Sequence, residues 1–318
     1  EVDNKSTLDG ATDAAKKLIS EKVSFVIGGY NADSCIGMVD VLDKAYIPTI
    51  VCSNTDISLT NGRYCTYRLC KDDTFVASCM ANHIKNKGDS TVAIISMKND
   101  KHSESFTKYF TLACEKVELK VVKTLMLDKG LKDMRKSLSD IKDVSPESIY
   151  ILADRDDAID IVKNIRDMEI TADISGSDMW EYKGVIDEAG SSAENIDFIS
   201  FYDQNNTNTQ ASYDFIHGKN DDKGFVNYLL TNGQEEYVYP ESALAYDAYM
   251  IIYNALLTAN TTKLDDMLKC IDDITYEGAS GVLSFDENGD VRQNKAYIKK
   301  INDKKVVNDE IINLDSIQ

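Results

Sequence analysis

The first two thirds of the chain alternate between two spacings of hydrophobic residues. Residues 8–19 place alanine, leucine and isoleucine on one helical face, and the run "VSFVIGG" that follows is short and closed by glycines. This alternation of helix and short strand continues to residue 202. Helices that separate short apolar strands are typical of parallel sheets with crossover helices on both faces, so the pattern predicts an α/β fold.

The same spacings predict individual elements. Helices are predicted at residues 8–19, 33–44, 74–84, 106–117, 131–141, 157–168 and 242–259. Strands are predicted at residues 23–29, 47–51, 91–96, 119–127, 148–153, 172–177, 196–202, 295–301 and 305–311.

Length, composition and charge narrow the class of protein. With 318 residues, 43% of them hydrophobic, the chain can bury two medium cores, which favours two lobes. No apolar run approaches the roughly 20 residues that span a bilayer, so direct membrane insertion of this chain is not expected. The net charge of −19 is spread along the sequence, which argues against nucleic acid and anionic lipid as partners. Small molecules and proteins remain.

The seven cysteines contain no C-x-x-C pair, so neither a zinc ribbon nor a thioredoxin motif is predicted. Most are expected to be small buried hydrophobic residues. A bridge between Cys65 and Cys70 stays open as an alternative.

Polar residues follow one predicted strand directly. In "IPTIVCSNTDISLT", residues 47–60, the apolar run passes at once into Ser53, Asn54 and Thr55. Ligands of open parallel sheets bind beyond the carboxyl ends of the strands. Hydroxyl and backbone N–H groups at that place can hold a carboxylate without a positive side chain.

A second stretch of this kind is "IGGYNADS", residues 27–34. Glycines end the strand, and Asp33 or Ser34 is expected to cap the next helix. Taken singly, each of the two stretches is also compatible with an ordinary turn and cap.

Other motifs give no support for an enzyme, a cofactor or a metal site. "DENGD" at 286–290 has the wrong spacing for an EF-hand and predicts a tight turn between strands. No nucleotide-binding glycine motif occurs, and three scattered histidines are too few for an imidazole metal site. No nucleophile, base and orienting group form a catalytic set.

Several stretches together resemble the type I periplasmic binding proteins, in particular the Leu/Ile/Val-binding receptors of ABC transporters. The resemblance runs through the whole chain in order. Its most specific part is "YEGASGVLSFDENGDV" at 276–291, and its other parts are "GATDAAKKLISEKVSFVIGGYNAD", "AYIPTIVCSNTDISLT", "YRLCKDD", "ISGSDMW" and "LAYDA".

The resemblance implies how an amino acid would be held. Its carboxylate would lie on Thr55 and the helix end at residues 31–34, and Ser53 would offer a carbonyl to the ammonium group. Asp178 would supply the opposite charge. This agrees with the physical demand that a zwitterion leaving water finds donors at one end and an anion at the other. Asp178 is also compatible with a helix cap.

The chain departs from the family at several of these positions. The family usually has serine at Ala32, so Asp33 or Ser34 would have to replace that contact. His102 aligns, with one inserted residue, with a tyrosine of the family that often closes over the ligand. Asp154 falls where another aromatic residue is common in the family. As a ligand contact it would favour a ligand with an additional donor or positive charge, and a helix cap explains it equally well.

Two aromatic residues complete the candidate set. Tyr30 and Trp180 are candidates for lining the ligand site, or for core packing.

The resemblance also implies a domain organisation and a location. Two Rossmann-like lobes are expected, with crossings near residues 88–91, 203–207 and 292–297 that form a three-segment hinge. The first lobe would comprise residues 1–89 and 207–292, and the second 90–206 and 293–318. The family's first strand and helix precede the position of Val2 and are missing from this sequence.

The expected function is that of an extracytoplasmic binding protein, in the periplasm or as a cell-surface lipoprotein. It would bind a small amino acid by hinge closure and deliver it to an ABC transporter permease. The alternative is a ligand-sensing domain of a receptor or regulator with the same fold.

Overall fold

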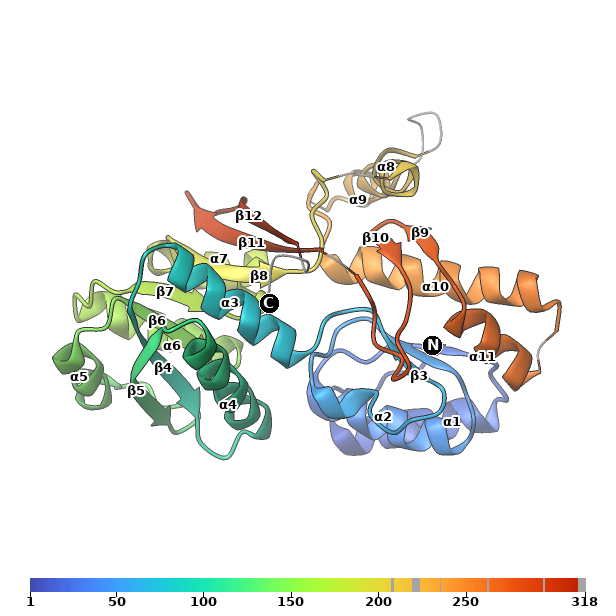
Figure 1. Ribbon diagram of the computed structural model, residues 1–318, viewed down its shortest axis with the longest axis horizontal. Helices are drawn as coiled ribbons and strands as arrows, with labels where there is room; N and C mark the ends of the chain where they lie inside the picture. Colours follow the sequence, from blue (N-terminus) through green and yellow to red (C-terminus); the bar gives the residue numbers. More distant parts are fainter. Residues whose placement is uncertain (207–208, 219–223, 235, 262, 294, 314–318) are drawn as a thin grey trace. The chain divides into compact units, whose positions relative to one another are not determined.

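The computed structural model describes residues 1–206, 209–218, 224–234, 236–261, 263–293 and 295–313. The chain forms two compact units (Figure 1). Unit 1 comprises Glu1–Asp72 and Phe201–Gln293, and unit 2 comprises Asp73–Ser200 and Asn294–Gln318. The chain therefore passes between the units three times. Residues 73–89, which the sequence analysis assigned to the first lobe, group with unit 2.

Unit 1 contains a parallel sheet and a separate hairpin. Its strands are β1 (Val26–Ile27), β2 (Thr49–Val51), β3 (Thr66–Arg68), β9 (Tyr276–Gly278) and β10 (Gly281–Leu283). Its helices are α1 (Leu8–Ser20), α2 (Ala32–Lys44), the short 3-10 helix η1 (Ile57–Leu59), α8 (Gln210–His217), α9 (Phe225–Thr231), α10 (Pro240–Ala259) and α11 (Leu264–Asp272). The sheet order is β1-β2-β3, and both pairs are parallel.

Unit 2 is built on a larger sheet. Its strands are β4 (Thr91–Met97), β5 (Lys120–Leu127), β6 (Ser148–Leu152), β7 (Asp173–Gly176), β8 (Ile196–Ser200), β11 (Lys295–Asn302) and β12 (Lys305–Asn313). Its helices are α3 (Asp73–Asn86), α4 (Lys101–Lys116), α5 (Arg135–Val144), α6 (Arg155–Asp167), η2 (Asp178–Glu181), α7 (Lys183–Ala189) and η3 (Gly190–Ala193).

The order in this sheet is β12-β11-β8-β7-β6-β4-β5. Strands β4 to β8 are parallel, and β11 and β12 add an antiparallel edge. The predicted α/β class is confirmed, because the parallel strands are separated in sequence by helices. The strand order reverses between β4 and β6, which is where ligands bind in doubly wound sheets.

Alternation along β6 assigns the helices of unit 2 to opposite faces of its sheet. Tyr150 stacks on Phe110 and Phe106 of α4, with ring centroids 4.3 and 5.8 Å apart. Its neighbours Ile149 and Ile151 belong to the hydrophobic core formed with α5, α6 and α7. Successive side chains of a strand point to opposite faces, so α4 covers one face and α5 to α7 cover the other (Figure 1).

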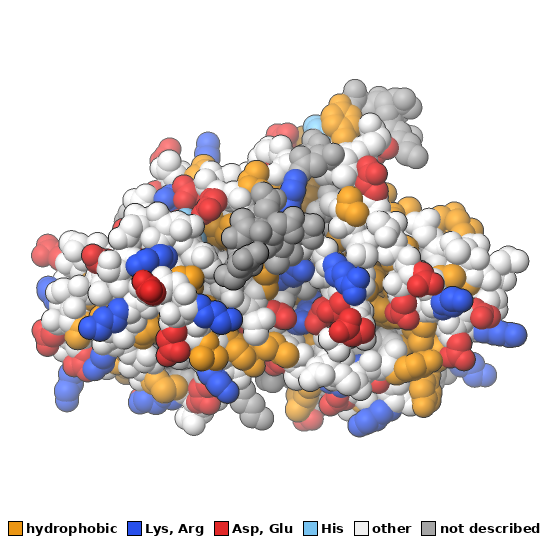
Figure 2. Space-filling model, in the orientation of Figure 1, with side chains coloured by type: hydrophobic (Ala, Val, Ile, Leu, Met, Phe, Trp, Pro, Cys, Tyr) orange, Lys and Arg blue, Asp and Glu red, His pale blue; other side chains and the backbone are white. Residues whose placement is uncertain are grey.

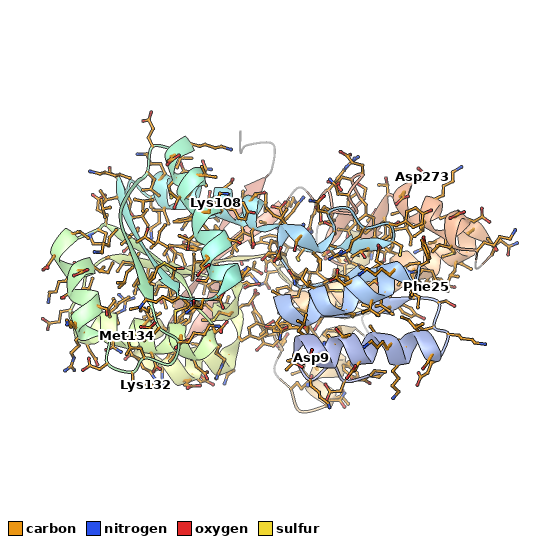
Figure 3. All side chains as sticks on the ribbon, turned by 90° about the horizontal axis from the view of Figure 1, so that it is seen from below. Asp9, Phe25, Lys108, Lys132, Met134 and Asp273 are labelled. Carbon is orange, nitrogen blue, oxygen red and sulfur yellow. The ribbon has the colours of Figure 1, made fainter. Side chains whose placement is uncertain are left out.

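In the loop before α5, hydrophobic side chains are buried or half-buried at the edge of this core and polar side chains are exposed. Met134, at the start of α5, is fully buried, whereas Lys132 is largely exposed and pairs with Asp160 (Figure 3). Over the visible face of the molecule, acidic side chains are interspersed with basic ones (Figure 2). The negative charge is therefore distributed, as the sequence predicted.

Helix α10 is apolar almost all round. Ala248 and Ile251 are buried, while Tyr249, Tyr253 and Leu257 are exposed. In this helix, Asp247 is buried and accepts hydrogen bonds from Ala279 N, Ser280 N and Ser280 Oγ at 2.6 to 2.8 Å. None of the described helices is both long and apolar enough to cross a membrane.

None of the seven cysteines forms a disulfide, and six are buried. The bridge between Cys65 and Cys70 is therefore not formed. Cys65 lies directly before β3 and Cys70 two residues after it, and their sulfur atoms contact different partners: Cys65 Sγ is 3.4 Å from Asp43 Oδ1, and Cys70 Sγ is 3.2 Å from Asn54 O.

His83 of α3 lies between two carboxylates of the unit 2 sheet. Nε2 is 3.2 Å from Asp197 Oδ2 of β8, and Nδ1 is 3.0 Å from Glu310 Oε2 of β12. Only the imidazolium donates from both nitrogens. Burial lowers the pKa of His83, but the hydrogen bonds and charges of Asp197 and Glu310 outweigh it, so the pKa is raised.

Two lysines complete this network. Lys87 Nζ is 2.8 Å from Asp197 Oδ2 and 2.6 Å from Asp173 Oδ2, and Lys300 Nζ is 3.3 Å from Asp197 Oδ1. The network ties α3 to β7, β8, β11 and β12. This explains why residues 73–89 group with unit 2.

We predict that His83→Gln lowers the free energy of unfolding by about 2 kcal/mol at pH 6, because hydrogen bonds to charged groups contribute about that much. Because the pKa of His83 is raised in the folded state, its protonation stabilises the fold. This contribution is fully present below about pH 6.5, the ordinary histidine pKa, and is lost as the pH rises through the pKa of the folded state. Urea unfolding from pH 5.5 to 8.5 measures this loss.

The difference between wild type and His83→Gln should shrink as the pH rises. His217→Gln, in an exposed position on α8, serves as the control and should leave stability unchanged. A difference that is constant or grows with pH would contradict an imidazolium at this position.

Candidate functional site

In unit 1, the carboxyl end of β1 leads into α2 through two glycines. Gly29 has a φ of +85°, and a Cβ there would lie 2.5 Å from Cys35 Sγ, so the tight turn requires glycine. Tyr30 after it is 56% exposed, and Ala32 is half-buried. The cap of α2 is Asn31, whose Oδ1 accepts from Ser34 N at 2.8 Å.

The prediction that Asp33 or Ser34 caps α2 is therefore wrong. Ser34 is buried and its Oγ donates to Asn31 O at 3.1 Å, inside the first turn of the helix. The side chain of Asp33 lies outside the described part of the structure.

The carboxyl end of β2 leads into the loop that carries Ser53 and Thr55, both half-buried. Asn54 Oδ1 accepts from Asp56 N at 2.8 Å, and Asp56 Oδ1 accepts from Ser58 N at 2.8 Å, where it caps η1. Side chains thus bind backbone N–H groups along the loop, which is the local chemistry of turns. The loop has a defined backbone at the strand end that the sequence singled out.

In unit 2, Asp178 follows the carboxyl end of β7 and is half-buried at the start of η2. The cap of η2 is Ser177, one residue earlier. Trp180 of the same short helix is fully buried in the unit 2 core. A Cβ at Gly176 would lie 2.6 Å from Trp180 Nε1, so Gly176 makes room for the indole. Trp180 is a core residue.

His102 follows the carboxyl end of β4 in the first turn of α4. Its Nε2 is 3.3 Å from Asp73 Oδ1, and its side chain is 42% exposed. Asp73 is buried at the start of α3, and its charge lies near the buried hydroxyl of Tyr150. That hydroxyl has no hydrogen-bond partner among the described residues. His102 and Asp73 therefore place a polar pair where the strand order reverses.

Asp154 follows the carboxyl end of β6 and occupies the cap position of α6, without a side-chain cap hydrogen bond. Lys129 Nζ lies 3.0 Å from Asp154 Oδ2 and 2.8 Å from Asp100 Oδ2. These hydrogen bonds raise the pKa of Lys129. Asp154 therefore shares the ammonium group of Lys129 with Asp100, and its side chain is largely exposed.

One group of side chains has the composition of a metal site: His83, Asp197 and Asp309 lie with ligand atoms within 4.8 Å of one another. Lys300 Nζ, however, is 3.3 Å from Asp197 and 3.5 Å from Asp309. The ammonium groups of Lys300 and Lys87 therefore already balance the charges of the Asp197 and Asp309 carboxylates, which would be the anionic ligands of a metal ion. The residues do not fit a metal ion.

We therefore expect neither EDTA nor Zn²⁺ to change the melting temperature at pH 7.5, because a bound cation would stabilise the fold in proportion to its excess over Kd. Differential scanning fluorimetry measures this directly. A stabilisation by Zn²⁺ that is lost in His83→Gln would overturn the charge argument.

Lys129 and Arg68 are not among the candidate residues that the sequence singled out. Lys129 lies outside every quoted motif, and only its position after β5 could have indicated that it reaches the ends of β4 and β6. Arg68 lies in the quoted stretch "YRLCKDD", and a charged residue at the end of a buried strand is itself a signal.

The fold and these strand ends are those of a ligand-binding domain, and a family model identifies it. The chain belongs to the family described as the receptor family ligand binding region, which matches residues 2–304. A comparison with curated protein sequences gives no match.

Solved structures of ABC transporter binding proteins share the fold. The leucine-binding protein LivK from Thermotoga maritima is 23% identical, with a TM-score of 0.88 over 99% of this chain and 87% of that one. LivJ from Streptococcus pneumoniae, in complex with isoleucine, is 23% identical with a TM-score of 0.84 over 98% and 86%.

A third structure extends the range of ligands among these neighbours. A solute-binding protein from R. palustris in complex with benzoate is 16% identical, with a TM-score of 0.80 over 98% of this chain and 83% of that one. The resemblance to type I periplasmic binding proteins is confirmed.

Proposed function

We propose that this chain is the solute-binding protein of an ABC transporter and binds a small amino acid or related zwitterion outside the cytoplasm. Two strand ends, each described within its own unit, carry this proposal. A structured loop with Ser53 and Thr55 ends β2 in unit 1, and Asp178 ends β7 in unit 2.

These groups match the two ends of an amino acid. Hydroxyl and backbone N–H groups of the Thr55 loop bind the carboxylate, and the carboxylate of Asp178 binds the ammonium group. A ligand that contacts both units stabilises their closed arrangement, because it contributes binding energy only there. That arrangement is what a permease would recognise, and no group in this scheme performs catalysis.

The ligands named for the structural neighbours support this class. Leucine and isoleucine carry both charges, whereas benzoate carries only the carboxylate. Asp178 favours the zwitterions, because its carboxylate attracts an ammonium group and repels a ligand that carries only a carboxylate. Asp154 already forms an ion pair with Lys129, so the proposal assigns it no contact with the ligand.

A ligand-sensing domain of a receptor or regulator is the second candidate. The description of the matching family as a receptor ligand-binding region supports this second candidate. Reconstitution with a permease in vesicles separates the two functions, since only a transport protein stimulates uptake.

We predict that at least one of the twenty amino acids raises the melting temperature of the wild type, and that Asp178→Asn removes this shift. Ligand at 100 times Kd contributes about 2.7 kcal/mol. The change to asparagine keeps the shape but removes the charge that pairs with the ammonium group. Thermal-shift measurement with each amino acid and with benzoate tests this.

Asp187→Asn is the matched control, because Asp187 is an exposed acid on α7 that pairs only with Lys183 among the described residues. It should retain the full shift. An amino-acid shift that survives in Asp178→Asn would remove Asp178 from the site, and a shift with benzoate alone would replace the zwitterion by an aromatic acid.

A further inference from the structure

Arg68, the last residue of β3, has a guanidinium that is fully buried. Arginine stays charged in proteins, and a buried charge is tolerated only when its donors find partners. The contacts of the Arg68 guanidinium therefore indicate which segments of unit 1 it holds in place. They come from two segments that are distant from each other in the sequence.

One partner is Asp290, in the turn that follows β10. Nε donates to Asp290 Oδ1 at 2.9 Å, and Nη2 lies 2.7 Å from the same oxygen as an ion pair. The backbones of the two segments are also paired, because Arg68 N donates to Gly289 O at 2.9 Å. A Cβ at Gly289 would lie 2.4 Å from Thr66 O, so only glycine permits this approach.

The other partner is the loop after β2. Nη1 donates to Asp56 O at 2.7 Å and to Asn54 O at 3.3 Å. These two carbonyls stand on either side of Thr55. A single nitrogen of Arg68 thus holds the peptide units that begin and end the dipeptide 55–56.

This arrangement fixes the direction of a donor that the guanidinium does not touch. The C=O and N–H groups of one trans peptide point in opposite directions. When Asn54 O is held toward Arg68, the N–H of Thr55 in the same peptide unit points away from it. In the same way, Asp56 O is held toward Arg68, so the N–H of Ile57 in that peptide unit points away from the guanidinium.

The far end of the loop depends on the same ion pair. Thr60, which ends η1, donates from Oγ1 to Asp290 Oδ1 at 2.9 Å. Both ends of residues 54–60 are therefore attached to Arg68 and Asp290. Since the two charges balance, the pair shapes the loop without adding a net charge beneath it.

We propose that Arg68 is a positioning residue for ligand binding: with Asp290 beneath the loop, it aims the backbone donor of Thr55 at the ligand carboxylate. This inference deepens the proposed function and rests on it for the identity of the ligand. Arg68 acts through the loop and does not contact the ligand.

The test compares Arg68→Lys with Arg63→Lys. Lysine retains the charge, so Asp290 keeps a cation, but a single ammonium group cannot form the fork that holds both the carboxylate and the carbonyls. Arg63 is a matched control in the same region. Its Nε donates to Leu59 O at 2.8 Å and its Nη2 is 2.9 Å from Asp40 Oδ1, outside the 54–56 segment.

Calorimetry with the amino acid that stabilises the wild type should give at least a tenfold weaker Kd for Arg68→Lys and an unchanged Kd for Arg63→Lys. Without ligand, hydrogen exchange measured by mass spectrometry should be faster over residues 53–57 in Arg68→Lys but not in Arg63→Lys. If Arg68→Lys does not fold, Asp290→Asn takes its place, because it keeps the shape and an oxygen acceptor.

An Arg68→Lys variant with lower stability but unchanged Kd and unchanged exchange over residues 53–57 would overturn the inference while leaving the proposed function intact. Failure of the wild type to bind any amino acid would instead refute the proposed function. The exchange measurement then still decides whether Arg68 holds the loop.

Discussion

The buried ion pair of Arg68 and Asp290 is the constraint on which the candidate site of unit 1 depends. It joins the end of β3 to a segment 222 residues further along the chain. Breaking a buried pair by removing one partner is strongly destabilising, because it leaves a charge in the interior without compensation. The loop with Thr55 lies on this pair, so the energy that holds the fold together also determines the geometry of the candidate site.

Unit 2 uses charge in a comparable way at a different place. His83, Lys87 and Lys300 surround Asp197 and attach α3 to its sheet. This network lies apart from the carboxyl ends of β4, β6 and β7, where His102, Asp154 and Asp178 are found. These charges stabilise the fold, and the residues that we propose for ligand binding belong to a different set. Strands β4 to β8 run in the same direction, so their carboxyl ends lie along one edge of the sheet.

The chemistry of the two edges is asymmetric, and this asymmetry suits a dipolar solute. The loop of unit 1 offers hydroxyl and backbone donors over a balanced ion pair. The edge of unit 2 carries Asp178, and the neighbouring acid Asp154 forms an ion pair with Lys129. The zwitterion that we propose as ligand would present its carboxylate to the donors of unit 1 and its ammonium group to Asp178. This is the physical content of the proposed function.

Sequence alone determined the α/β class, the strands of the unit 2 sheet, and the tight turn at 286–290, where Asp286 N donates to Asp290 O at 2.9 Å. These features follow from hydrophobic periodicity and turn chemistry, which are local and readable from neighbouring residues. It also located Ser53 and Thr55 at a strand end, because parallel strands expose their carboxyl ends to loops. It did not predict the short strands β3, β9 and β10 of unit 1.

Only the tertiary structure decided which side chains meet. Contacts between distant segments make Trp180 a core residue, pair Lys129 with Asp154, and attach residues 73–89 to unit 2. Arg68 is the clearest case. Its partners are far apart in the chain, and the free energy of a charge in the interior depends on where those partners lie in space, which no local pattern records.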